Sequence, residues 1–254
     1  MIDRQTVELT GTRIATSHAG MHEIVLFSGA ERELLRRCQA LRYRVYHGDL
    51  GLETPDLDHV EKIDVEERDP RCDFAAVFDG GSTASGEVLG CIRMQPPDRG
   101  SYYAELEFDL VGPTWADTKL VEGARFAVTS TERNGPVPLL LFQAFRRYCR
   151  ERSIDHVLSV AIIRGDLEDR ARAARLTRYL VERAACALDR GRPARGYELE
   201  PPTDTEIARA GDLVPEEASP MLRLLANRRT TLCSQPAYCR RFGTFNFLLT
   251  TRLS

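Results

Sequence analysis

The stretch from residue 119 to residue 150 limits the folds open to this chain more than any other. Residues 119 to 128 alternate as a β-strand does, and a polar turn from 129 to 135 follows them. Pro136 then opens an amphipathic helix, since proline suits the first helical position. This order of strand, glycine-bearing turn and helix predicts one repeat of an α/β layer.

A second strand and helix follow in the same order, at residues 156 to 163 and 166 to 188. Residues 73 to 79 and 88 to 94 predict two more strands, and we expect them to be antiparallel neighbours because a turn begins at Gly80. The other predicted elements are a strand at 22 to 27, a helix from 28 to about 50, and paired strands at 230 to 238 and 242 to 251. Together they predict a mixed α/β (α+β) fold.

The helix expected from residue 28 has a start signal and a buried stripe. Ser28 and Glu31 fit a capping box. Apolar residues recur at three- and four-residue spacing, at Leu34, Cys38, Leu41 and Val45. Arg42 and Tyr46 lie four residues apart on a neighbouring face, so we expect an arginine beside an aromatic ring. The acidic residues 51 to 72 that follow predict a solvated connection.

Composition excludes several classes of function. The chain is 43% hydrophobic and 29% charged, which is typical of a globular protein. Its net charge of -3 argues against a nucleic-acid binder, because such proteins usually carry a basic surface that neutralises phosphates. No apolar run approaches the roughly 20 residues that span a bilayer, and residues 1 to 30 lack the pattern of a signal peptide. We therefore expect a cytoplasmic protein.

Neither a disulfide framework nor a metal site is expected. The seven cysteines are odd in number and scattered, without a C-x-x-C pair, so most should be reduced thiols in the core. His18 and His22 have the spacing of two metal ligands on a helix, but Gly20 interrupts them and no third ligand is near in the sequence.

The turn from 129 to 136 is the first candidate site. Where a strand passes into a helix, backbone N–H groups and the helix dipole suit a phosphate. Arg133, Asn134 and Gly135 are therefore candidate contacts for a pyrophosphate or a phosphopantetheine, because arginine adds charge and glycine allows close approach. An ordinary turn explains the same residues equally well.

Glu122 is the second candidate, because an unpaired carboxylate is costly to bury in an apolar strand. Arg125 is its nearest partner, and a structural ion pair is the simplest interpretation. The functional interpretation makes Glu122 a general base for an attacking amine and Arg125 a group that positions a carboxylate. Gly123 predicts a bulge that would turn both side chains into one cleft.

Other charged residues fit either surface pairs or a binding cluster for a zwitterion. They are Arg42, Arg44, Arg93, Asp69 and Asp73. A local basic surface is expected from arginines at 146, 147, 150 and 152 and along 170 to 183. Acidic acyl carrier proteins would dock on such a surface, and solvated helix faces explain it equally well.

Short motifs follow one another from about residue 40 onward. They are Leu41-Arg42-Tyr43-Arg44-Val45-Tyr46, Arg68-Asp69-Pro70-Arg71-Cys72-Asp73, Leu89-Gly90-Cys91-Ile92-Arg93, Glu105-Leu106-Glu107-Phe108-Asp109 and Glu122-Gly123-Ala124-Arg125-Phe126. In order and spacing they resemble the GNAT (Gcn5-related N-acetyltransferase) type of acyltransferase, the group that includes ornithine-lipid-forming N-acyltransferases and acyl-homoserine-lactone (autoinducer) synthases.

The C-terminal motifs are more similar to the ornithine-lipid branch. They are Gln235-Pro236-Ala237-Tyr238 and the run from Phe242 to Leu249. Two positions depart from the family pattern. Ala124 precedes the arginine, so any hydroxyl role there is lost, and Asn246 stands where an aspartate is common.

The resemblance implies a GNAT-like fold with a mostly antiparallel central sheet flanked by helices. It implies transfer of a fatty acyl group, 3-hydroxyacyl groups included, from acyl carrier protein or acyl-CoA to the amine of an amino acid such as ornithine. It assigns Glu122 and Arg125 to catalysis. It assigns substrate binding to Arg42, Tyr46, Asp69, Asp73 and Arg93. No metal or redox cofactor and no nucleic acid are implied, and a peripheral membrane contact stays open.

Four segments are then expected along the chain. They are an N-terminal extension at 1 to 21, a GNAT-like core at 22 to 195, a linker or lid at 196 to 220, and C-terminal strands at 221 to 254 that complete the sheet. The third segment is rich in proline and acidic residues, with only a weak helix near Ile207.

Three alternative functions remain open. An autoinducer synthase would take S-adenosylmethionine as acceptor, although Leu52 stands where that branch tends to carry a tryptophan. An acetyl-CoA-dependent acetyltransferase would need its pyrophosphate loop in the imperfect stretch Arg133-Asn134-Gly135-Pro136. A non-catalytic protein that binds acyl groups or carrier proteins would not depend on the carboxylate of Glu122.

Overall fold

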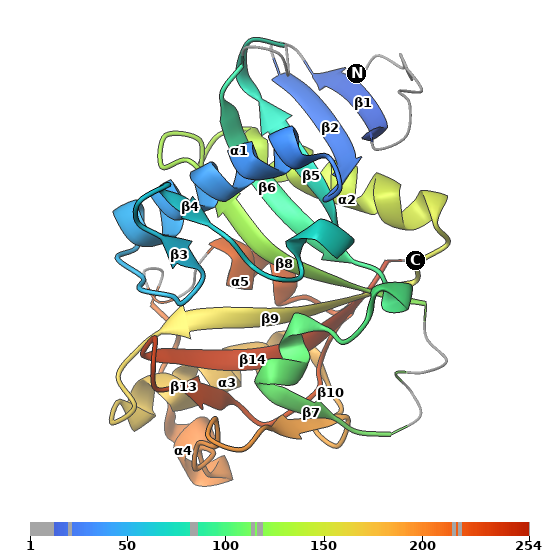
Figure 1. Cartoon of the computed structure of the whole chain (residues 1–254). Coiled ribbons are helices and arrows are strands. Elements are labelled where there is room, and N and C mark those ends of the chain that lie inside the picture. The colour runs from blue at the N-terminus through green and yellow to red at the C-terminus, as the bar shows by residue number, and fades with distance from the viewer. Residues whose placement is uncertain are drawn as a thin grey trace. The chain divides into compact units, whose positions relative to one another are not determined.

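The computed structural model describes residues 13–19, 22–81, 86–112, 115, 119–214, 217 and 220–253. Two compact units divide the chain. The first unit comprises Met1–Arg99 and Gly123–Ser153, and the second comprises Gly100–Glu122 and Ile154–Ser254. The chain passes from the second unit to the first between Glu122 and Gly123, inside strand β8 (Leu120–Val128), which therefore contributes to both (Figure 1).

The first unit is built on a sheet in the order β1-β2-β5-β6-β8. Its strands besides β8 are β1 (Arg13–Ala19), β2 (His22–Ser28), β5 (Asp73–Phe78) and β6 (Val88–Gln95), and a small separate pair is β3 (Leu57–Asp58) with β4 (Ile63–Asp64). β1, β2, β5 and β6 pair antiparallel in succession. This confirms the strands expected at 22 to 27, 73 to 79 and 88 to 94.

Helices α1 (Arg32–Tyr43) and α2 (Val137–Glu151) cover opposite faces of this sheet (Figure 1). Buried side chains of α1 and β5 share one core cluster with Cys91 of β6: Leu34, Cys38, Leu41, Phe74 and Phe78. The preceding residue of β6 faces α2, since a Cβ at Gly90 would lie 2.6 Å from Val137 and 3.0 Å from Leu141. Successive strand residues point to opposite faces, so the sheet is buried on both sides.

The start of α1 differs from the prediction. Glu31 is the N-cap and no side chain caps the helix, while Ser28 accepts a 3.4 Å hydrogen bond from the backbone of Ala30. The predicted capping box is therefore wrong. The chain first turns at Gly29, where a Cβ would lie 2.0 Å from the carbonyl oxygen of Asp69, so the helix begins only after this close approach.

The rest of this helix follows the prediction. It continues beyond Tyr43 as the π-helix η1 (Arg44–Asp49), so it ends close to the expected residue 50. The predicted stripe is buried at all four positions, Leu34, Cys38, Leu41 and Val45.

The second unit contains a sheet in the order β8-β9-β14-β12-β10, with β13 paired to β14. Its strands are β9 (His156–Arg164), β10 (Ala185–Cys186), β12 (Thr230–Leu232), β13 (Ala237–Cys239) and β14 (Thr244–Arg252), and β7 (Phe108–Leu110) pairs separately with β11 (Gly191–Pro193). β9 is parallel to β8 and antiparallel to β14. The C-terminal strands pair as predicted, although the first is split into β12 and β13.

The helices of the second unit are α3 (Arg170–Arg183), α4 (Asp204–Arg209) and α5 (Pro220–Leu225). α3 is shorter than the predicted 166 to 188. Its start is fixed by Asp169, whose side chain accepts a hydrogen bond from the backbone of Arg172. Its end is fixed because residues 185 and 186 pair with β12 instead of continuing the helix.

The segment from 196 to 220 is attached to α3 by ion pairs. Arg170 makes two 2.9 Å hydrogen bonds to Glu206, and Arg175 lies 2.5 Å from Glu217. The weak helix expected near Ile207 is present as α4, with a capping box between Thr203 and Glu206. A lid function for this segment stays a prediction.

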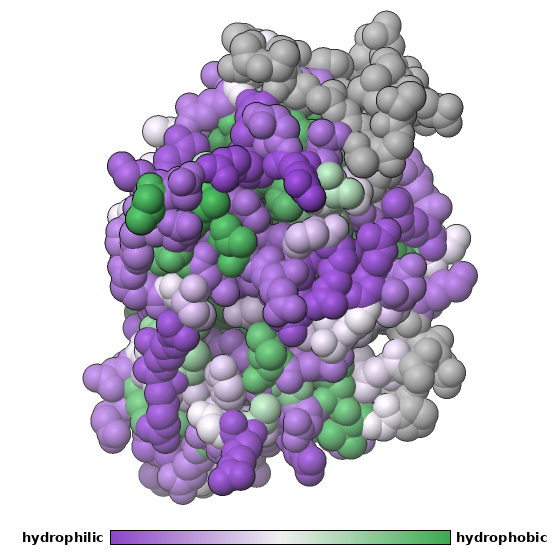
Figure 2. Space-filling view, viewed as in Figure 1, coloured by the Kyte–Doolittle hydropathy of each residue, from purple (hydrophilic) through white to green (hydrophobic). Residues whose placement is uncertain are grey.

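Both units combine strands that pair mostly antiparallel with covering helices, which confirms a mixed α/β fold. Of the expected extension at 1 to 21, residues 13–19 form β1 and the others lie outside the described residues. Every helix in the described ranges is too short or too polar to cross a bilayer. Hydrophilic residues dominate the face of the molecule drawn in Figure 2.

Candidate functional site

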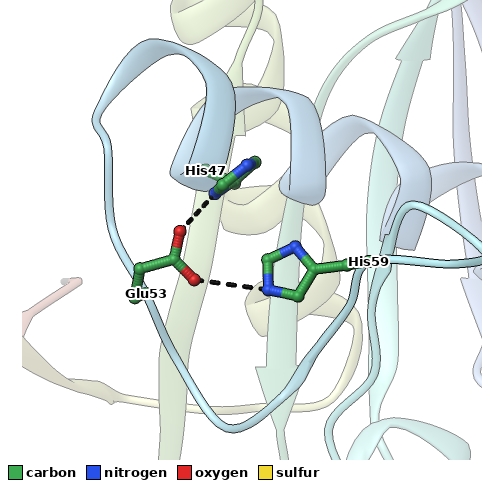
Figure 3. A group of neighbouring side chains, drawn as sticks. All are labelled: His47, Glu53 and His59. Atoms are coloured by element: carbon green, nitrogen blue, oxygen red, sulfur yellow. Dashed lines mark ion pairs between the residues drawn. The ribbon is translucent and has the colours of Figure 1, made fainter.

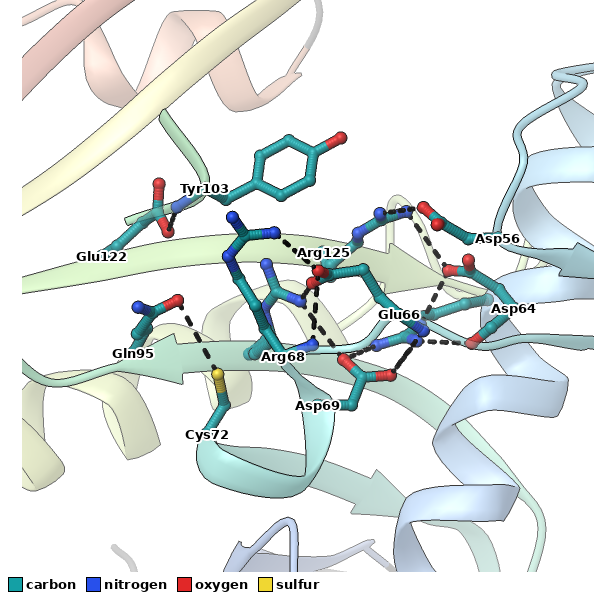
Figure 4. A network of polar contacts seen from close by, with 12 residues as sticks. Asp56, Asp64, Glu66, Arg68, Asp69, Cys72, Gln95, Tyr103, Glu122 and Arg125 are labelled. Atoms are coloured by element: carbon teal, nitrogen blue, oxygen red, sulfur yellow. Dashed lines mark hydrogen bonds and ion pairs between the residues drawn. The ribbon is translucent and has the colours of Figure 1, made fainter. Parts of the chain in front are cut away.

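Eight charged side chains of the first unit form a continuous chain in which acidic and basic groups alternate (Figure 4). In order they are Arg68, Glu66, Arg93, Asp69, Arg42, Asp64, Arg125 and Asp56. We call this set the ion-pair chain. With four arginines and four carboxylates its formal charges balance, which is how buried charges are tolerated in a protein interior.

Asp69 occupies the middle of the ion-pair chain. Its carboxylate lies 2.5 Å from Nη2 of Arg42 and 3.2 Å from Nη1 of Arg93, and it also accepts a 3.0 Å hydrogen bond from Gln39. Burial alone would lower the pKa of Arg42, but the carboxylates of Asp69 and Asp64 outweigh it and raise that pKa above its usual value. The guanidinium therefore stays charged although its side chain has no exposed surface.

Asp64 links this centre to strand β8. Its Oδ2 lies 2.9 Å from Nε of Arg42 and 3.4 Å from Nη1 of Arg125. Arg125 then reaches Asp56 at 2.6 Å. The inner members have little or no exposed side-chain surface, whereas Arg125 is 9% and Asp56 is 25% exposed. At the opposite end Arg68 is 15% exposed, so Asp56 is the member of the ion-pair chain that a ligand reaches most easily.

The acidic stretch 51 to 72 is exposed at many positions, as predicted for a solvated connection, but three of its acids are buried. Asp64, Glu66 and Asp69 are buried because each has an arginine of α1, β6 or its own loop as partner. Sequence reasoning missed Asp56, Asp64, Glu66 and Arg68 as site residues. Two sequence features could have indicated them. Acidic residues follow the apolar Ile63, and the arginines at 42, 93 and 125 lie in apolar patterns and need acidic partners.

Arg42, Asp69 and Arg93 are brought together as the candidate substrate residues were expected to be, and Tyr46 lies in the same unit. The hydroxyl of Tyr46 donates a 3.3 Å hydrogen bond to the carbonyl of Phe126, next to Arg125. Burial raises the pKa of Tyr46, so this phenol stays protonated at neutral pH.

Asp73 has different partners. Its carboxylate accepts a 2.7 Å hydrogen bond from the hydroxyl of Tyr148 and lies 3.6 Å from Arg152, both belonging to α2 or its C-cap. The sequence predicts Asp73 in the same charged cluster as Asp69. The structure does not place it there, because the two carboxylates contact side chains of different helices and strands. Burial, followed by the neighbouring Asp73, raises the pKa of Tyr148.

Glu122 belongs to the second unit and is held by backbone groups. Its Oε2 accepts a 2.7 Å hydrogen bond from the N–H of Tyr103 (Figure 4). Its Oε1 accepts one of 2.7 Å from the N–H of Ala104. Only 2% of Glu122 is exposed. Two N–H donors are suitable partners for an ionised carboxylate. A catalytic role for Glu122 and its pairing with Arg125 stay predictions.

Strand β8 departs from ordinary strand geometry at Arg125. Arg125 has φ = 53°, in the left-handed region that side chains other than glycine rarely adopt. This conformation turns the strand locally, as the predicted bulge would, and it accompanies the contacts of Arg125 with Asp56 and Asp64. Backbone strain is stored at this candidate site residue.

The turn before α2 is exposed at Asn134 and Gly135. Arg133 donates a 3.2 Å hydrogen bond to the carbonyl of Val128 and pairs with Asp49. A Cβ at Gly135 would lie 2.6 Å from a carboxylate oxygen of Glu132, so an acid lies beside the proposed phosphate position. Binding of phosphopantetheine by Arg133, Asn134 and Gly135 therefore stays a prediction, with Glu132 counting against it.

Two polar residues from the sequence motifs meet in the second unit. Nδ2 of Asn246 donates a 2.7 Å hydrogen bond to Glu107, and both residues are buried. An amide at position 246 donates to this glutamate, which an ionised aspartate cannot do.

The cysteines are poor candidates for a covalent mechanism. All seven are free, and six of them are buried while Cys186 is exposed. Burial raises the pKa of several thiols, in the case of Cys149 to about 12. Burial also raises the pKa of Cys186, Cys233 and Cys239. A hydrogen bond with Cys91, followed by burial, raises the pKa of Cys38. A thiol whose pKa is raised carries little thiolate at neutral pH.

Residues 41–143 match the family model of the acetyltransferase (GNAT) domain. All eight members of the ion-pair chain lie inside this range, together with Glu122 and the turn before α2. This stretch of the chain is therefore similar to the GNAT domain, in agreement with the sequence motifs.

Two curated relatives carry the name L-ornithine N(alpha)-acyltransferase. The one from Rhodobacter capsulatus is 29% identical over 150 residues, which cover 57% of this chain and 57% of the relative. The one from Brucella abortus is 25% identical over 163 residues, which cover 61% of this chain and 57% of the relative. The chain thus spans somewhat more than half the length of the curated relatives that it matches.

Among solved structures, the acyl-homoserine-lactone synthase LasI aligns with 92% of this chain and 89% of its own, with a TM-score of 0.48 and 12% identity. FeeM, an N-acyl amino acid synthase from uncultured soil microbes, aligns with 91% of this chain and 92% of its own, with a TM-score of 0.45 and 13% identity. TM-scores below 0.5 do not establish a common fold, so the fold class rests on the strands and helices themselves.

Proposed function

We propose that the protein is an N-acyltransferase that moves a fatty acyl group, 3-hydroxyacyl groups included, from a thioester to the amine of an amino acid such as ornithine. The donor is an acyl carrier protein thioester or acyl-CoA, and the compartment is the cytoplasm. The observation that carries this proposal is the ion-pair chain, which lies wholly inside the matched GNAT-type domain. The names of the two curated relatives support the acceptor class.

The charge pattern of the ion-pair chain suits a zwitterionic acceptor. At its accessible end a guanidinium and a carboxylate stand together, Arg125 and Asp56. The carboxylate of an amino acid would bind Arg125 in fork geometry, and a second ammonium group, such as that of ornithine, would bind Asp56. The inner members hold these two side chains in place, since Asp64 contacts both Arg42 and Arg125.

The reaction balances without a covalent enzyme intermediate. The neutral amine attacks the thioester carbonyl, the C–N bond forms as the C–S bond breaks, and the products are an amide and a free thiol. One proton leaves the amine and one arrives at the thiolate. We propose that Glu122 takes the amine proton, directly or through a water molecule, because its buried carboxylate is held in place by two backbone N–H groups.

The donor is expected to bind α2 and the turn before it. Arg146 and Arg150 are exposed on α2 and provide positive charge for an acidic carrier protein. Several arginines of α3 are instead paired with acids of the second unit, namely Arg170, Arg175 and Arg178. We therefore place the carrier-protein contact on α2 rather than on α3.

The proposal is tested by mixing the protein with acyl carrier protein and CoA thioesters and single amines, and by following thiol release and product mass. Release that requires ornithine or another amino acid, with an N-acyl product, supports it. Release that requires S-adenosylmethionine and yields a lactone would identify an autoinducer synthase instead. Transfer of acetyl groups alone would identify an acetyltransferase.

A non-catalytic binding protein gives a different pattern. It would bind acyl carrier protein without releasing thiol, and Glu122→Gln would leave that binding unchanged. An enzyme loses thiol release in the same variant while carrier-protein binding persists.

A further inference from the structure

Three possible metal ligands converge near the end of η1 in the first unit. Nδ1 of His47 lies 2.7 Å from Oε1 of Glu53, and Nε2 of His59 lies 3.3 Å from Oε2 of the same carboxylate (Figure 3). The ligand atoms all lie within 4.8 Å of one another. In the part of the chain that the structure describes, this is the only such group of three or more histidine, cysteine or acidic side chains.

The spacing of these atoms suits a small divalent ion. In a tetrahedral zinc site with bonds of about 2.0 to 2.1 Å, neighbouring ligand atoms are about 3.3 to 3.4 Å apart. The His59–Glu53 separation of 3.3 Å matches this value and the His47–Glu53 separation of 2.7 Å is shorter. All three ligand atoms lie within 4.8 Å of one another, so the exposed side chains must adjust to bind one ion. Imidazole nitrogen together with carboxylate oxygen is a donor set that zinc and its first-row neighbours prefer.

Tyr43 provides an outer contact for one of the ligands. Its hydroxyl lies 3.1 Å from Nδ1 of His59, the ring nitrogen opposite the one that faces Glu53. When an ion binds Nε2 of His59, the proton of the ring is on Nδ1, and this N–H donates a hydrogen bond to the phenol oxygen of Tyr43. The hydrogen bond fixes the tautomer and the orientation of the ring. The aromatic rings of Tyr43 and His47 also pack together, with their centroids 5.0 Å apart.

Exposure leaves room for entry and for a further ligand. The side chains of His47, Glu53 and His59 are 36%, 65% and 53% exposed. Water can therefore complete a coordination shell that the protein fills at three positions, as in zinc sites that keep one position open.

We propose that His47, Glu53 and His59 bind a divalent transition-metal ion of the zinc type. The ion fastens residues 53 to 59 to η1, because two ligands come from this segment and one from the helix. Asp56, the accessible end of the ion-pair chain, lies between the two ligands of the segment. Metal binding therefore restrains a predicted acceptor contact. This last link rests on the proposed function, whereas the metal site itself does not.

The test uses the untagged full-length protein, stripped with a chelator and titrated with Zn²⁺ in competition with a coloured zinc indicator. We expect one Zn²⁺ per chain, with affinity lowered at least about 100-fold by His59→Ala or Glu53→Gln. Tyr43→Phe should lower it about 10-fold, as expected for an outer contact. His22→Ala and Cys186→Ser should bind as the parent does, because they remove a histidine and an exposed thiol outside the group.

Hydrogen exchange gives a second and independent result. Zn²⁺ should slow amide exchange across residues 50 to 64 in the parent and not in His59→Ala, whose folding is checked by its far-ultraviolet spectrum. Binding of less than a tenth of an equivalent would overturn the proposal. So would binding that survives His59→Ala and disappears in Cys186→Ser. If the protein binds Zn²⁺ but transfers no acyl group, the proposed function is contradicted and the metal site is not.

Discussion

Arg42 and Asp69 form a bidentate pair with no exposed side-chain surface. Nη1 of Arg42 lies 3.1 Å from Oδ1 of Asp69, and Nη2 lies 2.5 Å from Oδ2. Nη2 also donates a 2.5 Å hydrogen bond to the carbonyl oxygen of Asp64, and Nε lies 2.9 Å from the carboxylate of Asp64 as an ion pair. An arginine is required here because only a planar fork can meet two acids and a carbonyl at once.

Replacing Arg42 by lysine should lower the free energy of unfolding by about 3 kcal/mol, because one ammonium cannot replace the fork and buried acids lose partners. Urea unfolding measures this change. The matched control is Arg36→Lys, at a solvent-exposed pair with Glu61, where the change should stay within about 0.5 kcal/mol. Equal effects at the two positions would show that the ion-pair chain contributes no special stability.

Variants of Asp56 and Asp73 test whether Asp56 contacts the acceptor while Asp73 has only a structural role. Asp56→Asn should raise the KM for ornithine about 10-fold, through loss of one charged contact, and leave the KM for the acyl donor unchanged. Asp73→Asn should leave both KM values unchanged, since Asp73 pairs with Tyr148 and Arg152. Steady-state kinetics at fixed donor concentration measures the two effects. A raised acceptor KM in Asp73→Asn alone would reverse the assignment.

Glu122→Gln should reduce kcat at least about 100-fold, the usual contribution of a general base. The control is Glu105→Gln in the turn that Glu122 contacts, where the carboxylate accepts a 3.1 Å hydrogen bond from Tyr102. The pH dependence of kcat separates chemistry from positioning. A base gives an acidic limb in the parent that the variant lacks, whereas a residue that only positions the turn leaves the shape of the profile unchanged.

The elements of the fold were largely predictable because each carries a local signal. The apolar runs at β5 and β6 reflect strands that are buried along almost their whole length, and the stripe on α1 reflects burial at helical spacing. The alternating sequence of β8 does form a strand, although burial does not alternate along it. Boundaries were less predictable where a distant contact decides them. α1 starts late because Gly29 approaches the backbone of Asp69, and α3 stops early because residues 185 and 186 join β12.

The candidate site was predictable only in part, for the same physical reason. Arg42, Arg93 and Arg125 stood out because a charge in an apolar pattern needs a partner. Their partners lie in an acidic stretch whose composition indicates solvent, so Asp56, Asp64 and Glu66 were missed. Burial of these acids is a property of the folded arrangement and has no local pattern.

Stability should fall at alkaline pH through Tyr148. Burial and Asp73 raise the pKa of Tyr148 above its unfolded value of 10.0. The folded state therefore holds this proton more tightly. Its stabilisation is fully present below about pH 10 and is lost as the pH rises through the folded pKa. Tyr148→Phe should flatten the decline of the unfolding free energy between about pH 9.5 and 11.5, as measured with urea.

Tyr148→Phe also removes the hydrogen bond to Asp73, so it should lower stability at pH 7 by about 1 kcal/mol. Tyr179→Phe, at the half-buried ring under Arg183, serves as the control. An unchanged alkaline slope in Tyr148→Phe would contradict the assignment.

Reversing charge on α2 should distinguish the two donor classes. The double variant Arg146→Glu with Arg150→Glu should raise the KM for acyl carrier protein substrates at least about 10-fold, because both side chains are exposed and the carrier is acidic. The KM for acyl-CoA should change less than about twofold. Equal effects on both donors would place the carrier-protein contact elsewhere. Arg178→Glu on α3 is the matched control.

The most direct measurement is the release of free thiol from a long-chain acyl carrier protein thioester, with and without ornithine. Release is expected only when the amine is present, with an N-acyl product of matching mass and with loss of activity in Glu122→Gln. Carrier-protein binding without amine-dependent release, for every thioester and amine tried, would contradict the acyltransferase function.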